Sequence, residues 1–318
     1  MLLPAAAPAA AERRRGFNLI ASPAHPLGSE AAARACAAMR RIGADTVALV
    51  PFLWQSHPAD PQIIRGADTS DDDLAAGIRQ ARAAGLRVLL KPHVWVPENW
   101  AGAVEMREEA HWQLWFRRYA TAIARLAEVA QAAGAEAFAI GTELARCSHR
   151  EEWEMVIAAA RAAFGGALTY VAHNAEEAQR VPFWTSLDAI GASLYPVLGP
   201  ADEEAAWVAP MRREAETLAG LAARLAKPVW VCEIGLRSAA GATERPWESA
   251  EERAAEPDEE LQARVLARWW QELDRPGIGM VLIWRWLTDP AAGGPRDTDF
   301  TVQGKQAELL LARLWRGG

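Results

Sequence analysis

The sequence predicts an α/β protein with a single (β/α)8 TIM barrel, and three features of the chain support that fold class. Short apolar runs, several rich in β-branched residues, recur along its 318 residues and are typical of strands buried on both faces. Helical patterns separate these runs in regular alternation, which favours a parallel sheet covered by helices. Links from helix to strand are short and links from strand to helix are long, so the long loops would share one rim of the barrel.

Eight strands and eight helices follow from this alternation. Each predicted strand is an apolar run that ends at a polar or turn-forming segment: residues 17–20, 46–52, 87–93, 137–142, 168–172, 189–194, 228–233 and 279–284. The helices occupy the intervals between and after them: residues 29–42, 71–84, 108–133, 150–164, 176–180, 210–226, 258–273 and 305–314.

Capping residues support several of these helix boundaries. Ser70 precedes three aspartates and is suited to cap the second helix. Residues 148–151 have the spacing of a capping box and predict the start of the fourth helix. Glycines at positions 43, 85, 134 and 165–166 predict helix ends that need a left-handed residue.

The chain divides into an N-terminal tail, residues 1–15, and one barrel domain, residues 16–318. The tail is rich in Ala and Pro and lacks the basic and apolar regions of a signal peptide, so we expect a cytoplasmic protein, or a secreted one if a signal peptide has been removed. No apolar stretch is long enough to cross a membrane, and a net charge of −7 argues against nucleic acid as a partner. The sequence does not indicate an oligomeric state.

Two glutamates at strand ends are the main candidates for chemistry. Glu143 follows the apolar run 137–142, and Glu233 ends the run 228–233. Residues at the C-terminal ends of barrel strands face the site in this fold. Two carboxyl groups facing one bound sugar are the machinery of glycoside hydrolysis, one as acid/base and the other as nucleophile. Both would otherwise be only charged residues that mark strand ends.

The chain is unusually rich in tryptophan, with 15 residues, and indole rings match the flat C–H faces of sugars. The tryptophans predicted at the site rim, with ligand contact or packing left open for each, are Trp54, Trp95, Trp100, Trp247, Trp284 and Trp286. Those on predicted helices are expected to pack against the barrel: Trp112, Trp115, Trp153, Trp269, Trp270 and Trp315.

Polar residues at other strand ends complete the candidate site. Lys91 and His93 end the third predicted strand, Asn174 follows the fifth and Tyr195 the sixth. Each could bind a sugar hydroxyl or a catalytic carboxylate, or form a satisfied polar layer, and Tyr195 could donate to Glu233.

The sequence indicates no cofactor. It has no HExxH motif or HxH pair at a strand end and no GxGxxG, P-loop or GxSxG motif, so neither a metal nor an organic cofactor is expected. Cys36, Cys147 and Cys232 are expected to fill the core rather than form disulfides.

Several ordered pieces of the chain together carry a family resemblance. They are Lys91-Pro92-His93, Ile140-Gly141-Thr142-Glu143-Leu144, Phe183-Trp184, Leu187-Asp188-Ala189-Ile190-Gly191, Tyr195-Pro196, Lys227-Pro228, Glu233-Ile234-Gly235, Ser238, Pro246-Trp247 and Gly304-Lys305.

Together these pieces resemble glycoside hydrolase family 113, a clan A family similar in type to endo-β-1,4-mannanases, over about residues 16–315. The resemblance implies a retaining mechanism with Glu143 as acid/base and Glu233 as nucleophile. It also implies that Trp284 floors the cleavage subsite and that Tyr195 lies near the nucleophile. Many clan members carry Asn before the acid/base to bind the sugar 2-hydroxyl. Here that position is Thr142, and Asn174 is a possible substitute.

The sequence therefore predicts a retaining hydrolase that cleaves β-1,4-mannosidic linkages in mannan or manno-oligosaccharides. Two alternatives remain open at this point. A clan A β-glycosidase acting on glucan or another β-linked exopolysaccharide would have almost the same sequence features. A sugar-binding barrel without catalysis is the other, although a binder needs neither glutamate. The sequence does not indicate the mode of attack, internal or from a chain end, or the number of subsites.

Overall fold

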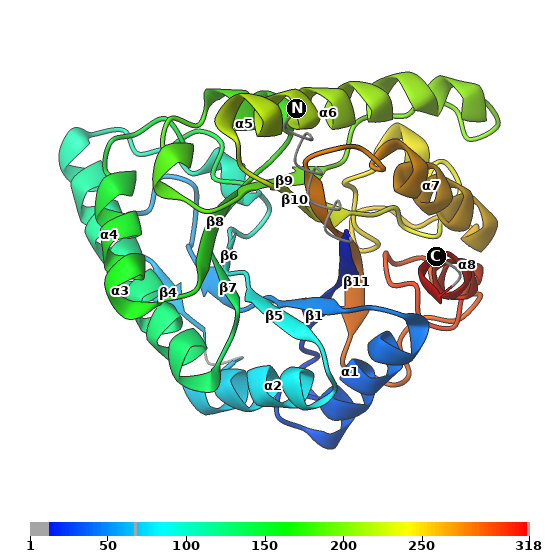
Figure 1. Cartoon of the computed structure of the whole chain (residues 1–318), viewed down its shortest axis with the longest axis horizontal. Coiled ribbons are helices and arrows are strands. Elements are labelled where there is room, and N and C mark those ends of the chain that lie inside the picture. Colours follow the sequence, from blue (N-terminus) through cyan, green and yellow to red (C-terminus); the bar gives the residue numbers. More distant parts are fainter. Residues whose placement is uncertain (1–12, 67–68, 317–318) are drawn as a thin grey trace, which may run out of the picture.

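The protein is a closed eight-stranded parallel barrel, as predicted. The structure, a computed structural model, describes residues 13–66 and 69–316, and its barrel strands follow the order β1-β11-β10-β9-β8-β7-β5-β2 (Figure 1). These strands are β1 (Arg14–Ile20), β2 (Thr46–Leu49), β5 (Arg87–Leu90), β7 (Ala137–Thr142), β8 (Ala167–Ala172), β9 (Ile190–Leu194), β10 (Val229–Ile234) and β11 (Ile278–Leu287).

Helices surround the barrel on its outside (Figure 1). They are α1 (Glu30–Ile42), α2 (Asp71–Ala83), α3 (Glu109–Ala133), α4 (Trp153–Ala163), α5 (Ala175–Arg180), α6 (Glu204–Leu225), α7 (Glu259–Glu272) and α8 (Gln306–Arg316), with short 3-10 turns η1 (Ala101–Ala103), η2 (Trp184–Ser186) and η3 (Ala242–Glu244). Ser70 caps α2 in a capping box with Asp73, as its sequence context predicts.

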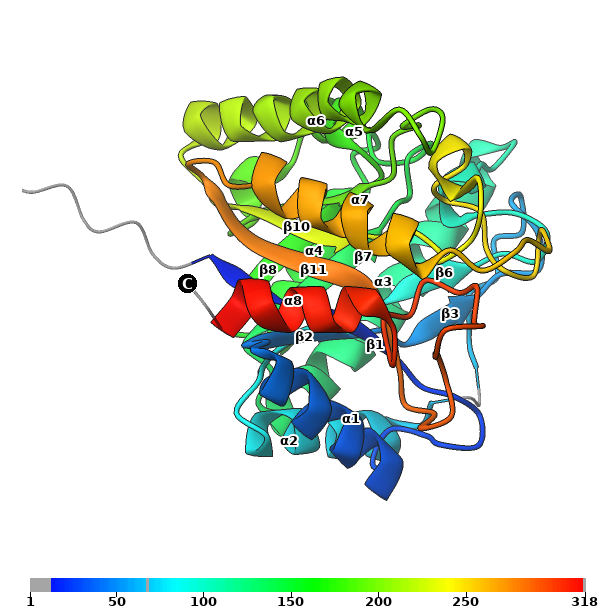
Figure 2. The same cartoon turned by 90° about the vertical axis from the view of Figure 1, so that its right-hand side faces the viewer.

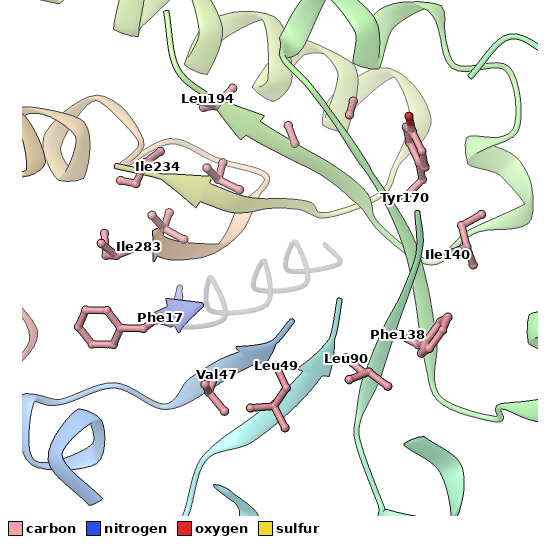
Figure 3. Close-up of a cluster of buried hydrophobic side chains, with 14 of the residues drawn as sticks. Phe17, Val47, Leu49, Leu90, Phe138, Ile140, Tyr170, Leu194, Ile234 and Ile283 are labelled. Atoms are coloured by element: carbon pink, nitrogen blue, oxygen red, sulfur yellow. The ribbon is translucent and has the colours of Figure 1, made fainter. Parts of the chain in front are cut away.

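Two packed layers hold the barrel together. Side chains on the outer face of every barrel strand point toward the helices (Figure 3) and belong to one large buried cluster. The interior is filled by a second cluster of mostly smaller side chains that includes Ala48, Ala139 and Cys232. All three cysteines are free and buried, as expected. The predicted helical tryptophans join the outer layer, five of them buried and Trp270 partly buried.

The second and third predicted strands are each divided by a proline. The wall strands β2 and β5 end before Pro51 and Pro92, which have no amide hydrogen to donate to the ladder. Beyond each proline the chain continues as β3 (Phe52–Trp54) and β6 (His93–Trp95). With β4 (Ile64–Arg65) these form a separate three-stranded sheet at the C-terminal end of the barrel (Figure 2).

Two helix starts differ from the sequence prediction. The helix α4 begins at Trp153, and the Ser148 hydroxyl donates to the Ala145 carbonyl instead of capping a helix. The helix α6 begins at Glu204, before Pro210, because buried Trp207 anchors the earlier turns and its indole N–H donates to Pro200. Gly165 and Gly166 do not have a positive φ, and α4 ends instead at an extended Phe164.

The barrel begins two residues earlier than predicted. Arg14 and Arg15 are part of β1, and the Arg15 guanidinium donates to the carbonyls of Gly43 and Trp315 at the base of the barrel. The rest of the predicted tail, apart from Arg13, lies outside the described residues. Within the described part of the chain, no helix has the length and apolar character that a membrane span requires.

Candidate active site

Glu143 sits at a strained turn just past the end of β7. The pairing of β7 with β8 shifts register between Ala139 and Thr142, an irregularity of the kind that re-aims side chains near active sites. Glu143 itself has φ 57°, the left-handed region that a non-glycine residue rarely adopts. Its amide N–H donates to the Val171 carbonyl at 2.7 Å, which fixes this turn against β8.

Glu233 is the second-last residue of β10, and its side chain is almost fully buried. The register of β10 with β9 shifts between Val231 and Glu233. Lys91 forms a buried ion pair with Glu233 Oε1, and the Tyr195 hydroxyl donates to Oε2 at 3.0 Å. Gly235 follows because a Cβ there would lie 2.6 Å from the Trp284 carbonyl oxygen. The carboxylate is therefore held at both oxygens.

Two histidines flank the Glu143 carboxyl group. His173 Nδ1 lies 3.5 Å from Oε1, and His93 Nε2 lies 3.9 Å from Oε2. Burial alone would raise the pKa of Glu143, but His173, His93 and Lys91 together hold that pKa below its ordinary value. Burial lowers the pKa of His173, and the nearby carboxylates, Glu143 above all, outweigh it and raise that pKa.

The two carboxylates act on the same surroundings. Burial raises the pKa of Tyr195 well above its ordinary value, and the charges of Glu233 and then Glu143 raise it further. The pKa of His173 is likewise raised by both glutamates. Tyr195 and His173 therefore each interact with both carboxylate charges, as expected for side chains gathered at one end of the barrel.

Aromatic rings lie beside the residues that surround the two glutamates. The Lys91 ammonium lies 5.1 Å from the ring centroid of half-buried Trp284. Trp100 packs on His173 with ring centroids 4.5 Å apart and leaves 42% of its own surface exposed. Trp95 is 48% exposed on β6, two residues beyond His93.

Two residues predicted to bind substrate are committed elsewhere. Trp286 is 3% exposed and packs against Phe17, because the register of β11 with β1 shifts between Ile283 and Trp286. This shift reverses the alternation, so the Trp286 side chain joins the outer core layer and not the barrel mouth. Asn174 is the N-cap of α5, where its side-chain oxygen accepts from the Glu177 amide at 2.8 Å. The Thr142 hydroxyl is also used within the protein, since it donates to the Pro92 carbonyl.

His173 and Arg285 were missed by the sequence analysis. His173 lies between the end of β8 and Asn174, and this position directly after a barrel strand was the available signal. Arg285 follows Trp284 on β11, pairs with Asp299 and lies 5.9 Å from the Trp284 ring. Its position inside an apolar strand gave no indication of that contact.

The loops after β10 and β11 are joined by a buried lysine. Lys305 Nζ donates to Ser238 Oγ at 2.7 Å, to Asp297 Oδ1 at 2.8 Å and to the Asp299 carbonyl at 2.9 Å. Because Asp299 also pairs with Arg285, this network fixes the wall of the site next to Trp284. Across residues 13–66 and 69–316, no group of three or more His, Cys, Asp or Glu side chains is arranged to hold a metal ion.

A (β/α)8 barrel with two glutamates at the ends of its fourth and seventh strands has the design of the barrel glycosidases. The model of Glycoside Hydrolase Family 113 matches residues 21–305, nearly the whole chain. The chain therefore belongs to this family and is a glycoside hydrolase. None of the curated proteins matches it.

The chain is also similar to solved structures. The GH113 β-mannanase AaManA from Alicyclobacillus acidocaldarius, in complex with ManMIm, is 27% identical with a TM-score of 0.85, and the alignment covers 96% of this chain and 97% of that one. A GH113 β-1,4-mannanase is 22% identical with a TM-score of 0.84, over 96% and 100%. A β-glucuronidase from Ruminococcus gnavus shares only the fold, at 14% identity and a TM-score of 0.64, over 95% of this chain and 49% of that one.

Proposed function

We propose that this enzyme cleaves β-1,4-mannosidic linkages in mannan or manno-oligosaccharides by double displacement, with Glu143 as acid/base and Glu233 as nucleophile. The main support for the proposal is that the two glutamates have different neighbouring side chains. Glu233 is fixed at both oxygens by Lys91 and Tyr195, whereas Glu143 has only histidine nitrogens beside it, His173 at 3.5 Å and His93 at 3.9 Å. A nucleophile needs a fixed, ionised carboxylate, and an acid/base needs a mobile proton.

In the first step, Glu143 donates its proton to the glycosidic oxygen while Glu233 attacks the anomeric carbon. The bond between that carbon and the leaving oxygen breaks, and a covalent glycosyl–enzyme forms. The pKa of Glu143 is low in the free protein, so the carboxyl must gain a proton for this step. A bound sugar excludes water from the carboxyl, and desolvation favours its neutral form.

In the second step, the ionised Glu143 takes a proton from water, which attacks the anomeric carbon and releases Glu233. The nearby His173 stabilises this ionised state through its positive charge. Two inversions at the same carbon retain its β-configuration. The reaction needs no cofactor, because both proton transfer and attack are performed by carboxyl groups.

The choice of mannose is supported by the similarity to AaManA, a β-mannanase, over 96% of this chain. The product pattern on mannohexaose tests the linkage and the reaction together. We expect shorter manno-oligosaccharides, with the newly formed reducing end first appearing as the β-anomer by proton NMR.

Cleavage of cellohexaose in preference to mannohexaose would replace mannan by glucan as the substrate. Release of the α-anomer first would contradict double displacement. Tight binding of mannohexaose without any cleavage after long incubation would leave a sugar-binding barrel in place of an enzyme.

Replacement of His173 by glutamine is expected to move the alkaline limb of the kcat/KM profile to higher pH. His173 lowers the pKa of Glu143, so its removal lets burial raise that pKa and keeps the acid protonated at higher pH. His93 and Lys91 still lower the pKa of Glu143 in this variant, which limits the shift of the limb. In the wild type, the charges of Glu177 and Glu233 also raise the pKa of His173. The matched control is His149→Gln at an exposed histidine. An unchanged limb, or one displaced to lower pH, would contradict this role.

A further inference from the structure

The small sheet at the barrel rim carries an aromatic outer face. Phe52 pairs with His93 and Trp54 with Trp95 in the parallel β3–β6 ladder, so the four side chains share one face. Ile64 lies opposite Trp54 on β4 and extends the same face. We call this set, Phe52, Trp54, Ile64, His93 and Trp95, the rim platform.

The opposite face of the same sheet belongs to the core. Leu53 and Val94 alternate with the platform residues and are 0% and 2% exposed. Trp95 and Ile64, in contrast, are 48% and 60% exposed. The sheet therefore packs on the core through one face and exposes large apolar side chains on the other. Exposure of such a group of apolar side chains to water is unfavourable and is typical of a binding surface.

The platform rings support one another. Trp95 lies 6.0 Å from Trp54 and 5.9 Å from Phe52 between ring centroids, and Phe52 lies 6.1 Å from His93. These distances are within the range of favourable aromatic pairs, which holds the Trp95 ring in place before any ligand arrives. A held ring loses little freedom on binding, so stacking on it costs little entropy.

One end of the platform reaches the reacting groups. His93 lies 3.9 Å from the Glu143 carboxyl, and Trp95 is the next residue of β6 on the same face, about 7 Å further along the strand. That step is comparable to the length of a pyranose unit. A sugar chain with a linkage at Glu143 can therefore lay a more distant unit on Trp95.

The chemistry of the face suits neutral sugar. Phe52, Trp54, Ile64 and Trp95 carry no ionisable group and offer flat apolar surface, which matches the C–H face of a pyranose. We propose that the rim platform is a distal sugar subsite that binds a pyranose away from the cleaved linkage and favours longer chains. This inference rests on the proposed function, since the chain it binds is the substrate.

Chain-length dependence tests the platform. The variant Trp95→Ala is expected to lose about five- to ten-fold in kcat/KM on mannohexaose, the range of one aromatic contact. It should stay within about two-fold of the wild type on β-mannosyl fluoride, which has a single sugar and a leaving group too small to reach Trp95. Trp95→Tyr should recover most of the loss. Leu309→Ala, at an exposed apolar position on α8, is the matched control and should change neither rate.

Equal losses on both substrates, or no loss on mannohexaose, would overturn the subsite. A lower molecular mass of Trp95→Ala in sedimentation would also overturn it, because the platform would then be a contact between two copies of the chain. If the wild type cleaves neither substrate, the proposed function fails separately. Calorimetric binding of mannohexaose then decides: weaker binding by Trp95→Ala supports the subsite, and unchanged binding removes it.

Discussion

Replacement of Glu233 by alanine is expected to lower turnover of manno-oligosaccharides by at least about 10⁴-fold, because no group then forms the covalent intermediate. Sodium azide should restore cleavage of an activated aryl β-mannoside. The small anion enters the space left by the carboxylate and attacks the anomeric carbon from that side. The product should be the α-glycosyl azide, identified by NMR.

Two further variants test the assignment of Glu233 as the nucleophile. Glu176→Gln removes the charge of a glutamate whose side chain is 74% exposed on α5 and should keep wild-type turnover. Glu233→Gln, which keeps the shape but not the charge, should be as inactive as the alanine variant. Near-full activity in Glu233→Gln would make the nucleophile assignment wrong.

Replacement of Glu143 by alanine is expected to slow hydrolysis of unactivated manno-oligosaccharides by about 10²- to 10⁴-fold, the usual contribution of general acid–base catalysis. Substrates with a good leaving group need little protonation, so a dinitrophenyl β-mannoside should still form the glycosyl–enzyme. This intermediate should accumulate and appear as a burst of phenol, because water then lacks its base.

Azide distinguishes this variant from the first. With Glu233 present, azide attacks the glycosyl–enzyme from the side of the missing Glu143, so the product should be the β-glycosyl azide. Formation of the α-azide by Glu143→Ala, or an equal loss on activated and unactivated substrates, would contradict the acid/base assignment. The two azide experiments thus show independently which glutamate lies on which side of the anomeric carbon.

The sequence was informative where a local pattern has a single structural meaning. Apolar runs alternating with helical patterns predicted all eight barrel strands. The two glutamates also lie where these runs end, Glu143 directly after β7 and Glu233 near the end of β10. Ser70 capped its helix as expected because the capping box depends only on neighbouring residues. The division of strands at Pro51 and Pro92 was also available locally, but the apolar runs concealed it.

The sequence was misleading where side-chain direction or distant neighbours decide the outcome. Trp284 and Trp286 are both tryptophans at the end of the last predicted strand, so the sequence does not distinguish them. In the structure Trp284 lies beside Lys91, and Trp286 packs on Phe17 in the core. His173 and Asn174 are adjacent, but Asn174 caps α5 and His173 reaches Glu143. A shift of one residue in a turn exchanges such roles, and a single sequence does not fix it.

The sequence by itself determined the barrel, its family and the two glutamates, because hydrophobic periodicity and the ordered motifs are properties of the chain alone. Only the tertiary structure decided which groups surround each glutamate. Lys91 meets Glu233 across 142 positions, and the rim platform joins β3, β4 and β6 into one face. Such contacts arise when barrel closure brings distant strand ends to one rim, and no local pattern records them.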